Sequence, residues 1–155
     1  MRKTFAFTAL FSLLIDRLSK SAAKKLLFGK SLSIIPGIFN LTYAENPGAA
    51  FSILSSGNEL VRKTFLIVIP TAIVSLLLYY GLVKGTKDRL SASALGLICG
   101  GALGNLYDRV LYGKVVDFLD FHFKGYHYPT FNVADACVFI GCAILLFRHF
   151  HRPKE

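Results

Sequence analysis

Two long stretches without a charged residue constrain this chain of 155 residues more than any other feature. Phe65 to Val83 is an uncharged run of 19 residues, and Ser91 to Tyr107 is one of 17. At a rise of about 1.5 Å per residue, either run nearly crosses as a helix a hydrocarbon core roughly 30 Å thick. The hydrophobic content of 54% also exceeds what a soluble domain of this length usually carries. The chain is therefore predicted to lie in a membrane.

Two further apolar stretches bring the number of predicted spans to four. The stretch 131–149 is interrupted near its start by one acidic residue, Asp135. The N-terminal stretch 4–28 is apolar as far as Ile15 and then carries the charged residues Asp16 and Lys20. We therefore expect an all-α membrane protein with a single integral-membrane domain, 1–155. Its four transmembrane helices are predicted near 4–28, 64–83, 90–110 and 131–149.

The beginning of the chain also has features of a signal peptide, because Met1, Arg2 and Lys3 precede a short apolar stretch. The small residues of a cleavage site should follow that stretch. Asp16 and Arg17 stand there instead, so a retained first span is the preferred interpretation.

Basic residues give only weak information on orientation. An even number of spans places both ends of the chain on one side of the membrane. The Lys and Arg residues divide equally between the two sides, but the short basic loop 84–89 favours cytoplasmic termini. The net charge of +9 flanks the apolar spans instead of forming one basic stripe. We therefore expect contact with membrane lipid and not with nucleic acid.

The third predicted span carries two distinct stripes. Small residues recur at every fourth position: Ala92, Gly96, Gly100 and Gly104. Such a stripe allows another helix backbone to approach closely and predicts a packing face. A neighbouring stripe holds Gly101, Asn105 and Arg109, which predicts that an amide and a guanidinium lie one above the other on an inward face.

The connection between the first two spans predicts a small β-rich element. Ile38 to Ala44 is rich in β-forming residues and partly alternates, and the turn residues Asn46, Pro47 and Gly48 follow. We expect this element to lie on the extracytoplasmic surface of the membrane. Asn46 is a turn residue there and a candidate donor to a substrate backbone.

Acidic residues in or near the spans are costly unless they pair or face a wet cavity. Asp16 and Lys20, at positions i and i+4, are expected to pair with each other. Asp117 and Asp135 lie among apolar neighbours with no basic residue within two positions. If these two carboxyl groups meet, repulsion makes them share one proton, which provides an acid and a base together as in aspartic proteases. A proton relay and a structural role are the alternatives from these residues alone.

Five motif blocks in order resemble those of the lipoprotein signal peptidases, also called signal peptidase II. The blocks are DRLSK (Asp16 to Lys20), NPGAAFS (Asn46 to Ser52), GGALGNLYDR (Gly100 to Arg109), VVDFLDF (Val115 to Phe121) and FNVAD (Phe131 to Asp135). The resemblance covers nearly the whole chain. It implies an aspartic endopeptidase that removes the signal peptide from diacylglyceryl-modified prolipoproteins by cutting before the lipidated cysteine.

The resemblance also implies roles for particular residues. Asp117 and Asp135 match the catalytic aspartates. The residues that match positions for substrate binding or site support are Asn46, Asn105, Arg109, Asn132, Asp16 and Lys20. No metal or organic cofactor is implied, and inhibition by globomycin-type peptides is expected. The implied location is the bacterial inner membrane, with the site near the periplasmic face and the enzyme acting as a monomer.

Two positions depart from the family pattern. Arg17 stands where the first block usually has Gln, and Pro47 stands where the loop block usually has Thr. Proline removes a backbone donor and fixes φ near −65°. Both departures bear on how substrate is positioned and leave the two aspartates in place.

Three other functions are compatible with parts of the sequence. A zinc hydrolase would use Asp117, Asp120, His122 and His127, although no HExxH spacing is present. A small transporter or proton channel would relay protons through intramembrane acidic residues, although the chain has no detectable repeat. A structural membrane subunit would need neither Asp117 nor Asp135.

Overall fold

The computed structural model describes residues 1–48 and 58–151. In chain order the elements are α1 (Arg2–Leu27), β1 (Ser31–Ile35), β2 (Phe39–Asn46), α2 (Glu59–Lys63), η2 (Thr64–Val68), α3 (Ile69–Tyr79), η3 (Tyr80–Lys84), α4 (Arg89–Tyr112), β3 (Val115–Phe123), β4 (Tyr126–His127) and α5 (Val133–Phe150). The end of the loop motif, 49–52, and the basic residues Arg152 and Lys154 lie outside the described residues.

The fold is mostly helical, and helices occupy each of the four predicted regions. From α2 to η3 the chain forms one helical segment, 59–84, in which η2 and η3 are π-helical turns. Within the described residues, three segments are long and apolar enough to cross a membrane: 59–84, 89–112 and 133–150. The fourth, α1, has 26 residues and carries charges in its second half.

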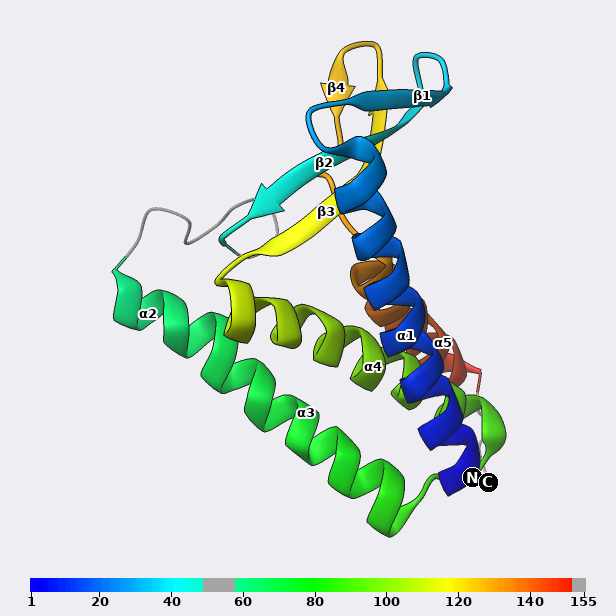
Figure 1. Cartoon of the computed structure of the whole chain (residues 1–155). Helices are drawn as coiled ribbons and strands as arrows, with labels where there is room; N and C mark the ends of the chain where they lie inside the picture. The colour runs from blue at the N-terminus through cyan, green and yellow to red at the C-terminus, as the bar shows by residue number, and fades with distance from the viewer. Residues whose placement is uncertain (49–57, 152–155) are drawn as a thin grey trace.

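A small antiparallel sheet of four strands, in the order β1-β2-β3-β4, lies at one end of the helices. The start of α1 and the end of α5 both lie towards the opposite end (Figure 1). The predicted β-rich element therefore contains β1 and β2, as expected. Its assignment to the first connection alone was incomplete, because β3 and β4 come from the connection between α4 and α5. Backbone pairing with β2 makes 115–123 a strand although acidic residues interrupt its apolar pattern.

The packing face predicted on the third span is confirmed. A methyl group added at Gly100 of α4 would lie 1.9 Å from Ser12 Oγ and 2.1 Å from the Ala9 carbonyl oxygen of α1. One added at Gly104 would lie 2.4 Å from Asp16 Oδ2. These distances are too short for nonbonded atoms, so only glycine allows the two helices to lie this close.

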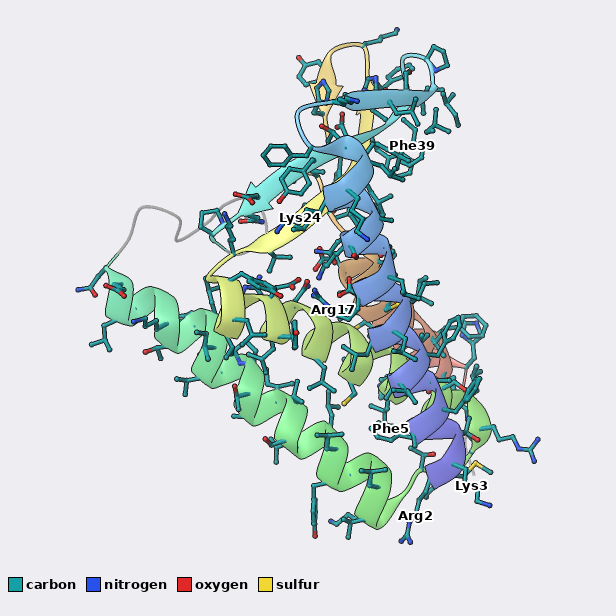
Figure 2. The ribbon with its side chains drawn as sticks, viewed as in Figure 1. Arg2, Lys3, Phe5, Arg17, Lys24 and Phe39 are labelled. Atoms are coloured by element: carbon teal, nitrogen blue, oxygen red, sulfur yellow. The ribbon has the colours of Figure 1, made fainter. Side chains whose placement is uncertain are left out.

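The helix α1 exposes large apolar side chains on its outside, while its buried face mixes apolar residues with polar and charged ones. Phe7 and Leu18 are both 70% exposed, whereas Ser12 and Asp16 are completely buried. Water would favour the reverse arrangement, but hydrocarbon around the protein favours this one. Arg17 lies beyond the middle of the helix, towards the sheet, on the side that meets α4 (Figure 2). The exposed apolar surface of α1 therefore fits contact with lipid.

Candidate active site

A cavity of about 480 Å³ lies where the sheet meets the ends of α4 and α5. Its polar lining includes six of the eight site residues predicted from the sequence: Asn46, Asn105, Arg109, Asp117, Asn132 and Asp135. The remaining two, Asp16 and Lys20, are buried on α1 outside the lining, where Lys20 contacts Asn105 and Asp16 contacts the backbone of α5. The rest of the lining is mainly apolar and includes Val115, Phe139 and Ile140. The cavity therefore combines two carboxyl groups with a hydrocarbon-like wall.

Asn132 connects the two aspartates. It is the N-cap residue of α5, and its Oδ1 accepts a hydrogen bond from the Asp135 backbone N–H at 3.0 Å. The Asp135 carboxylate in return accepts from the Asn132 backbone N–H at 3.3 Å, which completes a capping box. The Asn132 side-chain N–H₂ group donates to Asp117 Oδ1 at 2.6 Å. One helix cap therefore fixes the orientation of both carboxyl groups.

Asp117 lies on β3, and two asparagine side chains donate hydrogen bonds to its carboxylate. In the register of β2 and β3, Ala44 pairs with Asp117 and Asn46 pairs with Val115. Asn46 is therefore the diagonal neighbour of Asp117 on the same face of the sheet. Its Nδ2 donates to Asp117 Oδ2 at 3.1 Å, opposite the bond from Asn132. The pairing of β2 with β3 therefore places Asn46, the first residue of the NPGAAFS block, beside Asp117.

Burial raises the pKa of Asp117 to about 6. The nearby charge of Asp135 acts in the same direction, whereas the hydrogen bonds from Asn46 and Asn132 act against it. A carboxyl group with this pKa exchanges its proton near neutral pH. That property suits a group that must take up and release protons during a reaction.

Asn105 links the cavity to the buried charges of α1. Its Oδ1 accepts a hydrogen bond from Lys20 Nζ at 2.8 Å, and its Nδ2 donates to Asp135 Oδ1 at 2.8 Å. Because an ammonium group can only donate, Lys20 fixes which end of the amide faces the aspartate. Asn105 Oδ1 also accepts from Asn132 Nδ2 at 3.2 Å. Lys20 therefore orients a donor to Asp135 without lining the cavity itself.

A compact group of buried charges holds Lys20 in place. Lys20 Nζ lies 2.8 Å from Asp16 Oδ2 and 2.8 Å from Asp108 Oδ2. Asp108 also pairs with Arg17, whose guanidinium lies 4.5 Å from the centre of the Tyr107 ring. The predicted pairing of Asp16 with Lys20 is thus present, and Asp108 is a third member that the sequence analysis did not single out. Its burial depends on two cations from another helix.

Asp16 also joins α1 to α5 directly. Its Oδ1 accepts a hydrogen bond at 3.0 Å from the backbone N–H of Ala134, in the first turn of α5. The first N–H groups of a helix lack partners within the helix, so this carboxylate satisfies one of them. The helix that carries Asp135 is therefore fixed by a charge from the beginning of the chain.

Arg109 extends into the cavity from the last turn of α4. Its Nη2 donates to the Gly48 carbonyl oxygen at 3.5 Å, and its Nε is buried without a hydrogen-bond partner in the described part of the chain. The guanidinium therefore retains donor capacity at the wall that Asp117 and Asp135 share. Sequence reasoning found this residue but missed the segment 128–130, which also lines the cavity and has no charged residue to mark it.

The architecture and site define a membrane enzyme whose acidic pair lies at one end of its helices. A solved structure described as a bacterial membrane enzyme superposes with a TM-score of 0.82 at 33% identity. The similarity covers 99% of this chain and 94% of that one. Together with the apolar helices, this identifies a multi-pass bacterial membrane protein.

Sequence comparison then gives the family. Residues 8–151 match the family model of signal peptidase II. A lipoprotein signal peptidase of Sulfurihydrogenibium sp. (strain YO3AOP1) is 42% identical over 92% of this chain and 88% of its own. That of Yersinia enterocolitica is 46% identical over 81% of this chain and 73% of its own. The chain belongs to the lipoprotein signal peptidase family, whose members are proteases that remove lipoprotein signal peptides.

Proposed function

We propose that this chain is an aspartic endopeptidase that cuts diacylglyceryl-modified prolipoproteins immediately before the lipidated cysteine. The observation that carries the proposal is the cavity in which Asn132 joins Asp117 to Asp135. Family membership supports the substrate class.

In this mechanism the two aspartates share one proton. The ionised carboxylate takes a proton from a water molecule, whose oxygen attacks the scissile carbonyl carbon. The protonated carboxyl group donates its proton to the carbonyl oxygen, which gives a neutral tetrahedral intermediate. When the C–N bond breaks, the ionised carboxylate takes a hydroxyl proton from the intermediate, and the protonated carboxyl group gives its proton to the leaving nitrogen. The pair is then again singly protonated.

The surrounding residues keep the pair in this state. Asn46 and Asn132 each donate to Asp117, and Asn105 donates to Asp135. We assign Arg109 to binding the substrate backbone, because its guanidinium has N–H donors left over and can donate them to peptide carbonyl oxygens. Asp16 and Lys20 act through Asn105 and the first turn of α5 as supports.

The apolar part of the cavity suits the lipid portion of the substrate. Phe139 and Ile140 on α5 line the cavity and are 75% and 49% exposed. Acyl chains would meet these side chains from the bilayer without crossing a polar surface. We therefore propose that the diacylglyceryl group enters laterally along α5, while water reaches the aspartates from the sheet side.

The topology that fits this function has four spans, with α1 as the first. Its buried charges face α4, and its outer surface is apolar. We propose that both termini are cytoplasmic in the inner membrane and that the sheet lies on the periplasmic face. The enzyme is proposed to act as a monomer, to need no cofactor and to be inhibited by globomycin-type peptides.

Cleavage of a defined substrate tests this proposal. The purified chain in lipid-containing micelles is incubated with a prolipoprotein in diacylglyceryl-modified and unmodified forms, and mass spectrometry locates the cut. We expect cleavage before the modified cysteine and inhibition by globomycin. Cleavage elsewhere or equal cleavage of the unmodified form would contradict it.

A further inference from the structure

A second group of ionisable side chains lies in the sheet, away from the cavity that holds Asp117 and Asp135. Asp120 and His122 lie two residues apart on β3, so their side chains are on the same face. In the register of β3 and β4, His127 pairs directly with His122. Three side chains that are separated in the sequence thus meet at one point of the hairpin. None of them lines the active-site cavity described above.

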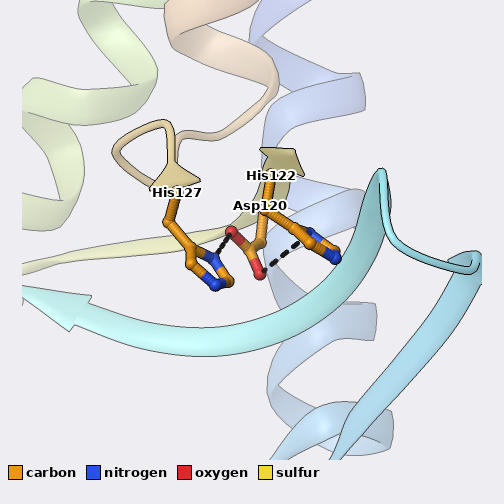
Figure 3. Close-up of side chains that lie close together, drawn as sticks. All are labelled: Asp120, His122 and His127. Carbon is orange, nitrogen blue, oxygen red and sulfur yellow. Dashed lines mark hydrogen bonds and ion pairs between the residues drawn. The ribbon is translucent and has the colours of Figure 1, made fainter. Parts of the chain in front are cut away.

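The two imidazole rings flank the Asp120 carboxylate (Figure 3). His127 Nδ1 lies 2.8 Å from Asp120 Oδ1, and His122 Nδ1 lies 3.9 Å from Asp120 Oδ2. The rings are stacked, with 4.9 Å between their centroids and an interplanar angle of 16°. One ligand atom from each of the three residues lies within 4.8 Å of the other two. Small side-chain rotations would bring these atoms to the separations found around one ion.

The surroundings of the cluster favour a bound cation. The Asp120 side chain is only 8% exposed, and in the described part of the chain its ion-pair partners are the two histidines. His122 Nδ1 is buried without a hydrogen-bond partner among the described residues. Asn40 Nδ2 lies 3.5 Å from Asp120 Oδ2 and supports the carboxylate from β2. A divalent ion would satisfy the buried nitrogen and neutralise the buried carboxylate together.

We propose that Asp120, His122 and His127 bind one divalent transition-metal ion of the zinc class. Two imidazole nitrogens and one carboxylate oxygen are ligands typical of Zn²⁺, and a tetrahedral ion keeps its fourth position for water. His127 is 57% exposed, so an ion reaches the group from the solvent side of the hairpin.

The position of this metal site gives it a structural role. β4 contains only Tyr126 and His127, and the segment 128–131 that follows lines the active-site cavity. An ion held by His127 and β3 would fasten the start of that segment. The inference does not depend on the peptidase mechanism, because these three residues lie outside the cavity.

Metal titration of the whole protein tests the site. The chain is purified in detergent through a tag without histidine, freed of metal with EDTA, and titrated with Co²⁺ and then with competing Zn²⁺. We expect one equivalent of Co²⁺ with the strong visible absorption of a four-coordinate ion, displaced by Zn²⁺. We also expect Zn²⁺ to raise the unfolding temperature of the wild-type chain.

Histidine variants provide the matched comparison. His122→Ala and His127→Ala should each weaken Zn²⁺ binding at least about tenfold and remove the thermal shift. His149→Ala and His151→Ala, at the end of α5, should bind as the wild type does. Because His127 is largely exposed, its variant should keep the metal-free unfolding temperature. Failure of the wild type to take up one equivalent would overturn the proposal. Equal binding by all four variants would do so as well.

Discussion

Asn132 shows how one side chain serves the fold and the candidate site together. The same amide accepts from the first turn of α5 and donates to Asp117 across the cavity. An asparagine has two donors and an acceptor, and this site uses both kinds. Serine or aspartate would also cap the helix, but neither offers the same donor to a carboxylate. The site therefore requires asparagine at position 132, whereas helix capping alone would also accept serine or aspartate.

The pKa of Asp117 leads to a prediction about the pH dependence of cleavage. Burial raises this pKa to about 6, so the carboxyl group gains its proton as the pH falls through that value. With the second aspartate also needed as the acid, the pair then lacks an ionised base. We expect kcat/KM for a lipidated substrate to fall below pH 6 by about tenfold per pH unit.

Asn46 provides the variant that checks this assignment. Its hydrogen bond lowers the pKa of Asp117, so Asn46→Ala should raise that pKa and move the acid limb to higher pH. Asn58→Ala, which alters an exposed helix cap that does not line the cavity, is the control. A flat profile between pH 5 and pH 8 would argue against Asp117 as the base. An acid limb at the same pH in Asn46→Ala as in the wild type would also argue against Asp117 as the base.

At the residue scale, sequence reasoning found charged residues more readily than it found their environments. Asp117 and Asp135 were singled out because apolar neighbours surround them. Asp108 was not singled out, but it is buried against Lys20 and Arg17. Its environment depends on the angle and distance between two helices, which local sequence does not contain. Arg17 departs from the family pattern, and its pairing with Asp108 gives that departure a structural role.

At the level of elements, the packing face of α4 was predicted better than the sheet, although the sequence did not name α1 as its partner. A stripe of small residues at every fourth position has a single geometric meaning on a helix. The strand β3 was missed because Asp117, Asp120 and His122 interrupt its apolar pattern. Those residues point into a cavity and a polar cluster of the folded chain, so they are inward-facing despite being polar. Strand partners far apart in the sequence supply the information that the local pattern lacks.

The close approach of α1 and α4 leads to a stability prediction. Gly100→Ala places a methyl group against Ser12 Oγ and the Ala9 carbonyl oxygen, and the backbone oxygen cannot move independently. We expect a loss of about 1–3 kcal/mol in the free energy of unfolding, measured by thermal unfolding in detergent. Val110→Leu adds a methylene group on the exposed side of the same helix and should have little effect. Equal stability of the two variants would show that the helices do not pack this closely.

At the scale of the whole molecule, the arrangement of polar and apolar residues explains where the site lies. Apolar side chains face outward along the helices, and the buried charges gather where the helices meet the sheet. The sequence alone predicted helical spans and a membrane location from the long uncharged runs. It did not predict that strands from both long connections form one sheet, because their pairing joins segments about 75 residues apart. That pairing sets the position of Asp117 relative to Asp135.

The two aspartates come from different elements of the fold, one from β3 and one from the first turn of α5. A test of their role must separate chemistry from folding. At pH 7 the raised pKa of Asp117 means that its ionisation opposes folding, since the native state holds the proton to higher pH than the unfolded chain. Asp117→Asn removes this penalty but places its own amide N–H₂ group opposite a donor from Asn46 or Asn132, so its unfolding temperature is measured together with its activity. Asp88→Asn is the control, because asparagine also caps α4 and the residue lies at the far end of that helix.

The most direct measurement is the cleavage rate of a diacylglyceryl-modified prolipoprotein by Asp117→Asn, Asp135→Asn and Asp88→Asn at pH 7. The account predicts that each of the first two variants loses activity by at least about 100-fold while remaining folded. Asp88→Asn should keep the wild-type rate. Wild-type turnover by either Asp117→Asn or Asp135→Asn would contradict the proposal that these two carboxyl groups activate water together.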